Sequence, residues 1–175
     1  MDKVEQYTSE DIEKFINVTK SLSNDTQSRS MRKLLSVKDR ISIFKNIEAD
    51  ELKVIIYDLK FIKYNLDDVI IKQNETSHQI FFIITGVCKV FSNAKKVGIL
   101  NAGDVFGEAG AIFNIKRNAT IVSNSNDVTL LSFCIDHNNM EFCSHSLATL
   151  YKNLAFQINT KLQELNYNYT IQGHI

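Results

Sequence analysis

The order of apolar and polar positions divides the chain into three zones. Across residues 8 to about 59, apolar residues recur every three or four positions, which is the spacing of amphipathic helices. Across residues 60–133, short apolar or alternating runs are separated by Asn and Gly, which is typical of strands and turns. From residue 136 to about 165 the helical spacing returns. The pattern therefore predicts helices at both ends of a central β region.

The central zone contains seven candidate strands. They cover residues 61–64, 69–71, 80–84, 87–91, 97–100, 119–122 and 128–133. Many short strands at this spacing favour a closed or double-sheet antiparallel fold, either a jelly roll or a barrel. Gly103 lies where a type II turn between two of these strands needs a positive φ angle.

The two helical zones differ in pattern. In the first, Thr8 and the acids after it form a helix start, and a polar break over residues 21–28 precedes further helical spacing. The last zone has a continuous apolar stripe close to a heptad seam, made of Leu147, Leu150, Tyr151, Leu154, Ile158, Leu162 and Leu165. This stripe must at least pack on the β core, and self-association through it stays open. Residues 167–175 are polar and aromatic and are predicted to be a flexible tail.

Composition limits the class of protein. Hydrophobic residues make up 44% and charged residues 23% of the 175 residues, which is typical of a folded domain. The 20 basic and 20 acidic residues cancel, so the basic excess of a nucleic-acid binder is missing. No signal peptide or apolar stretch of membrane-spanning length is evident, and Cys88 and Cys134 lie in strand-like runs as expected of buried free thiols. A cytoplasmic protein that contacts no membrane is therefore predicted.

The sequence gives no sign of catalytic or metal chemistry. Its four histidines are scattered at His78, His137, His145 and His174, without the paired-histidine and glutamate set that a metal-binding jelly-roll enzyme needs. No serine–histidine–acid or cysteine–histidine spacing stands out either. We therefore expect no catalytic residue, no metal ligand and no cofactor.

The strongest chemical signal lies in residues 105–121. Gly107, Glu108 and a run of small residues stand at a predicted short helix start, and Arg117 follows just before a strand-like run. Backbone N–H groups at a helix start attract phosphate, and a guanidinium group can fork onto phosphate oxygens. A carboxylate can accept a hydrogen bond from a sugar hydroxyl. These residue types favour a small ligand in which a phosphate neighbours a hydroxyl.

An ordered set of motifs surrounds this segment. In chain order the motifs read FKNIEADEL (44–52), DVII (68–71), IFFIITGVCKV (80–90), LNAGDVFGE (100–108) and RNAT (117–120). The set resembles the cyclic nucleotide-binding domain of cAMP-dependent protein kinase regulatory subunits, cyclic-nucleotide-gated channels and bacterial catabolite activator proteins. The spacing from Glu108 to Arg117 matches the phosphate-binding cassette of that family.

The resemblance implies a fold and a domain organisation. The fold class would be α+β and mainly β: an eight-stranded antiparallel β-roll, or jelly roll, with N-terminal helices, a short cassette helix and C-terminal helices. Residues 1–43 would form an N-terminal helical segment, and residues 44–166 the cyclic nucleotide-binding domain. Within that domain the β-roll would cover about 60–134 and the C-terminal helices about 136–166, with residues 167–175 as the tail.

The resemblance also implies a role for each site residue. Arg117 would pair with the cyclic phosphate, and Glu108 would accept from the ribose 2′-hydroxyl. The backbone at Gly107, Ala109 and Gly110 would approach the ligand closely, while Val97 and Ala119 would line the base pocket. Asn118 could contact the phosphate or a guanine amino group, so cAMP and cGMP both stay open. The full implied ligand-binding set is Val97, Phe106, Gly107, Glu108, Ala109, Gly110, Arg117, Asn118, Ala119 and Thr120.

The implied function is a receptor for a cyclic nucleotide, cAMP first and cGMP second, with the C-terminal helix closing over the base as a lid. A homodimer through the stripe from Leu147 to Leu165 is expected, as is a protein partner on the helices of residues 8–35. Only about ten residues follow Leu165, so no DNA-binding domain is expected.

The alternative function is a ligand-free interaction module of the same fold. The turn at residues 73–78, which departs from the usual glycine-rich form, and Ala111, in place of a bulky apolar residue, support that alternative.

Overall fold

The computed structural model describes residues 25–136 and 143–172, so the helix expected from Thr8 lies outside the described residues. Two four-stranded antiparallel sheets form a β-roll, with strand orders β1–β8–β3–β6 and β2–β7–β4–β5. The strands are β1 (Ile56–Tyr64), β2 (Val69–Ile71), β3 (Ile80–Thr85), β4 (Val87–Ser92), β5 (Lys95–Asn101), β6 (Val105–Phe106), β7 (Thr120–Ser123) and β8 (Val128–Ile135). The predicted eight-stranded roll is confirmed.

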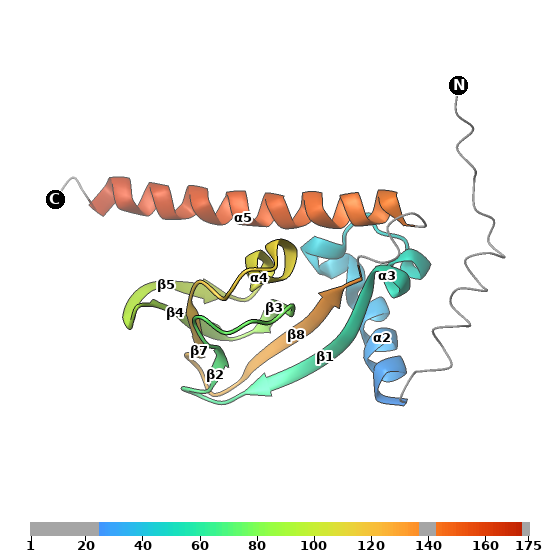
Figure 1. The fold of residues 1–175 in the computed structure, drawn as a ribbon, viewed down its shortest axis with the longest axis horizontal. Coiled ribbons are helices and arrows are strands. Elements are labelled where there is room, and N and C mark those ends of the chain that lie inside the picture. The colour runs from blue at the N-terminus through green and yellow to red at the C-terminus, as the bar shows by residue number, and fades with distance from the viewer. Residues whose placement is uncertain (1–24, 137–142, 173–175) are drawn as a thin grey trace, which may run out of the picture.

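Helices cover one end and one side of the roll (Figure 1). Four short elements precede the strands: α2 (Asp25–Val37), the 3-10 helices η1 (Lys38–Arg40) and η2 (Ser42–Phe44), and α3 (Ala49–Ile55). The helix α4 (Glu108–Phe113) connects β6 to β7, and α5 (Ser144–Gln172) follows β8. Figure 1 shows α5 running along the roll, with α4 between α5 and the strands.

Several predicted boundaries were wrong. The strand β1 begins at Ile56, before residue 60, because α3 passes directly into β1 and no turn residue interrupts the apolar run. The strand β6 has only two residues, too few to show an alternating pattern, and it was missed. Helix α2 starts at Asp25, inside the predicted polar break. Helix α5 continues through Gln172, where a flexible tail from residue 167 was expected.

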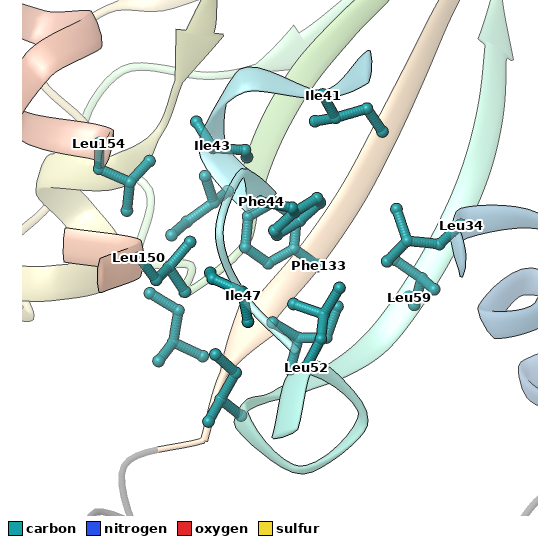
Figure 2. Close-up of a cluster of buried hydrophobic side chains, with 14 of the residues drawn as sticks. Leu34, Ile41, Ile43, Phe44, Ile47, Leu52, Leu59, Phe133, Leu150 and Leu154 are labelled. Carbon is teal, nitrogen blue, oxygen red and sulfur yellow. The ribbon is translucent and has the colours of Figure 1, made fainter. Parts of the chain in front are cut away.

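The larger hydrophobic core joins the N-terminal helices and α5 to the first sheet (Figure 2). The rings of Phe44 and Phe133 lie 5.2 Å apart, and Leu150 and Leu154 approach them from α5. A second core fills the space between the sheets, where the rings of Phe81 and Phe106 stack 5.1 Å apart. Burial of an aliphatic side chain of this kind contributes roughly 1.5–3 kcal/mol, so the start of α5 is fixed to the roll.

The apolar stripe of α5 is divided between two environments. Leu147, Leu150 and Leu154 are buried in the core of their own chain. Further along the helix, Ile158 and Leu162 are 44% and 54% exposed. The first half of the stripe is therefore occupied within the chain, and it is not available to a second copy in this conformation.

Polar contacts also fix the first half of α5. The Asn153 amide donates through Nδ2 to the carbonyl oxygens of Ile43 and Lys45, over 3.0 and 2.9 Å. The Ser146 hydroxyl donates to Oε2 of Glu51 on α3. These bonds orient α5 so that its second half runs past α4.

The three cysteines, Cys88, Cys134 and Cys143, are buried and free, as predicted for the first two. Within the described ranges, no helix combines the length and the apolar character needed to cross a bilayer.

Candidate functional site

A cavity of about 350 Å³ lies between the second sheet, α4 and α5, in the size range of small-molecule sites. Strands of the second sheet provide an apolar wall of Ile71, Val90, Leu100 and Ile121. The segment from Asp104 to Gly110 forms the second wall, and Arg117, Asn118 and Ala119 lie at the start of β7. Gln157, Ile158, Lys161 and Leu162 of α5 complete the lining. The cavity therefore combines an apolar surface with a few charged groups.

Local sequence explains how α4 starts and ends at the cavity. Gly107 precedes the helix with φ +84°, a left-handed conformation that costs glycine little. Asn114 ends it with φ +52°, and asparagine tolerates that region better than most residues. Between them, Glu108, Ala109 and Gly110 face the cavity. The strand β6, the left-handed Gly107 and the short helix α4 together place the carboxylate of Glu108 at the cavity, next to the backbone of Ala109 and Gly110.

Arg117 is the charged residue held most firmly at the cavity, with only 4% of its surface exposed. Its guanidinium donates through Nη1 to the carbonyl oxygen of Gly107, and through Nη2 to that of Gln79 over 2.6 Å. Its Nε is buried and has no hydrogen-bond partner among the described residues. Because a guanidinium has five N–H donors, Arg117 keeps donors for an acceptor in the cavity.

The backbone of Arg117 is also fixed, by the turn that follows β2. Its amide donates to the carbonyl oxygen of Glu75, and its own carbonyl accepts from the amide of Asn74, both over 2.9 Å. Asn74 adopts φ +71°, the left-handed conformation in which asparagine can stand in for glycine. The turn that departs from the family pattern therefore still supports Arg117.

The glycines beside Arg117 make room for its side chain. A Cβ atom on Gly107 would lie 2.8 Å from Nη1 of Arg117 and 2.9 Å from the carbonyl oxygen of Gln79. A Cβ atom on Gly110 would lie 3.1 Å from the same nitrogen. Sequence reasoning assigned both glycines to ligand approach, and in the structure both also lie against the buried guanidinium, more tightly at Gly107 than at Gly110.

Burial shifts the pKa of both charged residues. Loss of solvation raises the pKa of Glu108, and a backbone hydrogen bond and the charge of Arg117 partly oppose this. Loss of solvation lowers the pKa of Arg117, and the charge of Glu108 partly opposes that. Each charge therefore stabilises the other in a site where water solvates both poorly.

The structure brings eight of the ten predicted site residues together around the cavity. They are Phe106, Gly107, Glu108, Ala109, Gly110, Arg117, Asn118 and Ala119. Val97 does not line the cavity: it is 53% exposed, while Gly98 faces Val90 across the strand pair. Thr120 is also outside the lining, and its hydroxyl accepts from the amide of Gln73 over 3.0 Å. Thr120 lies between the lining residues Ala119 and Ile121, on a strand where side chains alternate between two faces, whereas Val97 lies at a register shift between β4 and β5.

The prediction missed three groups of lining residues, one of which is Asp104 and Val105, immediately before Phe106. The apolar wall of Ile71, Val90, Leu100 and Ile121 lies within predicted strands, and strict alternation from Ala119 would have found Ile121. The contributions of α5 come from about 40 residues further along the chain than Arg117. Ile158 and Leu162 belong to the apolar stripe, but nothing local marked Gln157 or Lys161.

The described part of the chain holds no cluster of three or more His, Cys, Asp and Glu side chains that could bind a metal ion. The polar and charged side chains that line the cavity belong to Asp104, Glu108, Arg117, Asn118, Gln157 and Lys161.

Comparison with known proteins finds sequence relatives of part of this chain. The model of the cyclic nucleotide-binding domain family matches residues 61–140. The chain is 30% identical over 124 residues to a cGMP-dependent protein kinase of Plasmodium berghei, covering 70% of this chain and 14% of the kinase. It is 28% identical over 96 residues to the type II regulatory subunit of cAMP-dependent protein kinase of Drosophila melanogaster, covering 55% of this chain and 25% of that subunit. The chain thus spans a quarter or less of the length of either relative.

The fold is shared with solved structures. A cyclic nucleotide-binding domain from Methylobacillus flagellatus superposes with a TM-score of 0.63 at 15% identity, covering 83% of this chain and 84% of that one.

Proposed function

We propose, from the premise that residues 61–140 form a domain of the cyclic nucleotide-binding family, that the cavity binds a cyclic purine nucleotide and that the chain acts as a regulatory receptor without a catalytic step. Both cAMP and cGMP are candidates, because the relatives include kinases named for each. The observation that carries the proposal is the buried guanidinium of Arg117, which faces the cavity with N–H donors to spare.

The lining offers a place for each part of such a ligand. The cyclic phosphate fits beside Arg117 and the backbone of Ala109 and Gly110, where charge-assisted hydrogen bonds are strongest. Glu108 is the acceptor for the ribose 2′-hydroxyl. The apolar wall that contains Val90 is suited to the face of a purine. Asn118 can donate or accept, so it can serve either base.

Binding would be transmitted through α5. Ile158 and Leu162 line the cavity although they are 44% and 54% exposed. A ligand against them would bury this apolar surface and favour one position of the helix over others. The functional domain in this proposal is residues 44–166, with the N-terminal helices as the surface that responds.

Isothermal titration calorimetry with cAMP, cGMP and 5′-AMP tests the proposal. Wild-type protein should bind at least one cyclic nucleotide more tightly than 5′-AMP. Arg117→Ala should lower that affinity by about ten- to a hundredfold, since a charge-assisted hydrogen bond contributes roughly 1.5–3 kcal/mol. Lys116→Ala is the matched control, because Lys116 is the exposed neighbour of Arg117 and does not line the cavity.

An absence of binding by wild-type protein would instead favour the ligand-free interaction module. Association of two copies through Leu147–Leu165 stays a prediction, and only the exposed part around Ile158 and Leu162 could take part without unfolding the core. Sedimentation velocity with and without the nucleotide would measure it.

A further inference from the structure

An ion pair joins α5 to the opposite wall of the cavity. The Lys161 ammonium donates to Oδ2 of Asp104 over 2.8 Å, and both residues line the cavity. The side chains are 25% and 21% exposed, so the pair is largely shielded from water. Surface ion pairs contribute little, but shielding and a direct hydrogen bond make this contact stronger than an exposed pair.

The structure holds the carboxylate of Asp104 in place. Its Oδ2 also accepts from the amide of Asn101 over 2.7 Å, and its amide donates to the carbonyl oxygen of Asn101 over 3.0 Å. Its carbonyl oxygen accepts from the amide of Ile83 on β3, also over 3.0 Å. The carboxylate is therefore oriented before the ion pair forms. Most of the conformational entropy that is lost on forming the pair is then lost by the Lys161 side chain, because Asp104 is already fixed.

Lys161 acts where α5 has left the core. Leu154 is the last residue of α5 that is buried among those described, and Lys161 lies about two turns beyond it. The pKa of Lys161 is raised: burial alone would lower it, but the hydrogen bond and charge of Asp104, with help from Glu164, outweigh burial. The ammonium form that the bond requires is thereby favoured.

We propose that the Lys161–Asp104 pair is a positioning contact that holds the second half of α5 against the β5–β6 turn and thereby sets the rate at which ligand enters and leaves the cavity. This inference rests on the proposed function. The cavity of about 350 Å³ is near the lower limit for small-molecule sites, so a shift of α5 changes access to it. Both partners belong to this chain, so the pair can form whether or not the cavity is occupied. Breaking it should speed association and dissociation together.

Two variants and one control test this role. Lys161→Met removes the charge and keeps the length of the side chain. Asp104→Asn keeps an oxygen that can accept from the amide of Asn101. Lys152→Met removes an exposed lysine of the same helix and is the matched control.

Two measurements report on different steps. Hydrogen–deuterium exchange of residues 155–164 in the absence of nucleotide reports how firmly α5 is held. Stopped-flow fluorescence with cAMP and cGMP carrying a nitrobenzofurazan group at C8 gives the association and dissociation rates. We expect faster exchange in both variants, and both rates to rise about three- to tenfold. The control should behave as wild type.

Unchanged hydrogen exchange and unchanged rates in both variants would overturn the inference. The inference would also be overturned if Asp104→Asn changed hydrogen exchange and the rates but Lys161→Met did not. That result would mean that the β5–β6 turn, and not the ion pair, controls the position of α5. If wild-type protein binds neither nucleotide, the proposed function fails, while hydrogen exchange still decides whether the pair positions α5.

Discussion

Gly107 and Arg117 depend on each other: the guanidinium donates through Nη1 to the carbonyl oxygen of Gly107, and a Cβ atom on that glycine would lie 2.8 Å from the same nitrogen. A Cβ atom essentially never lies within 3.0 Å of a non-bonded heavy atom, so any other residue at position 107 must displace the guanidinium or the backbone. The glycine and the arginine are ten residues apart in the sequence, but they form one unit of the site.

Gly107→Ala should therefore disturb more than backbone conformation. Gly103 provides a matched control, since its φ angle of +95° is close to the +84° of Gly107 and a Cβ atom there would meet nothing within 4 Å. Gly103→Ala should cost about 1–2 kcal/mol in free energy of unfolding from the positive φ alone. Gly107→Ala should cost more and should also weaken nucleotide binding. Equal losses in urea unfolding of the two variants would contradict a clash with Arg117.

Arg117 should contribute to stability as well as to binding. Arg117→Met would remove the donor to the carbonyl oxygen of Gln79 and one of the two donors to that of Gly107, which also accepts from the amide of Ala111. We expect a loss of about 2–4 kcal/mol in free energy of unfolding by urea denaturation. Lys116→Met should change it by less than about 0.5 kcal/mol, because Lys116 is exposed. If Arg117→Met were as stable as wild type, its hydrogen bonds would have no structural role.

Glu108 should make the protein less stable as pH rises. Burial raises its pKa in the folded state above the ordinary value of about 4.3 for glutamate. The folded state then binds more protons than the unfolded state between the two pKa values, so stability falls as pH increases through this window. Glu108→Gln cannot ionise, so it should be at least as stable as wild type at pH 7 while its affinity for nucleotide falls.

Thermal or urea unfolding of both proteins between pH 4 and pH 7 measures this difference. The stability of wild type relative to Glu108→Gln should decrease across the range. A wild-type protein that gained stability relative to the variant would mean that the carboxylate is stabilised in the fold, contrary to the effect of burial.

The cysteines should be unreactive in the folded protein. Burial raises the pKa of Cys88 and of Cys143 to about 11, and it also raises the pKa of Cys134. At pH 8 only about one in a thousand thiols of pKa near 11 is ionised, and the thiolate is the reactive form. Ellman's reagent should therefore label native protein very slowly, and label three thiols per chain rapidly in 8 M urea. Rapid labelling of the native protein would show that the roll opens readily.

Much of the local structure could be predicted from the sequence because it depends on near neighbours. Seven of the eight strands gave alternating or apolar runs, and Gly107 with Glu108 marked the start of α4. The boundary between α3 and β1 was predicted wrongly because a helical and a strand-like pattern overlap there. Ile56 fits the helical spacing that precedes it, yet it pairs with Ile135 as part of β1.

The order and spacing of residue types by themselves predicted a closed or double-sheet antiparallel fold with helices at both ends, because side-chain alternation and helical spacing are local patterns. They also marked residues 107–117 as a candidate phosphate site, whereas the eight-stranded roll was implied only by the resemblance to a known family. The tertiary structure alone decided that Gly110 makes room for a guanidinium, that Val97 lies outside the cavity lining, and that Lys161 reaches Asp104 from 57 residues away. These relationships depend on how the sheets and α5 pack together. Burial of apolar surface drives that packing but is not directional, so the local sequence does not show which distant residues come into contact.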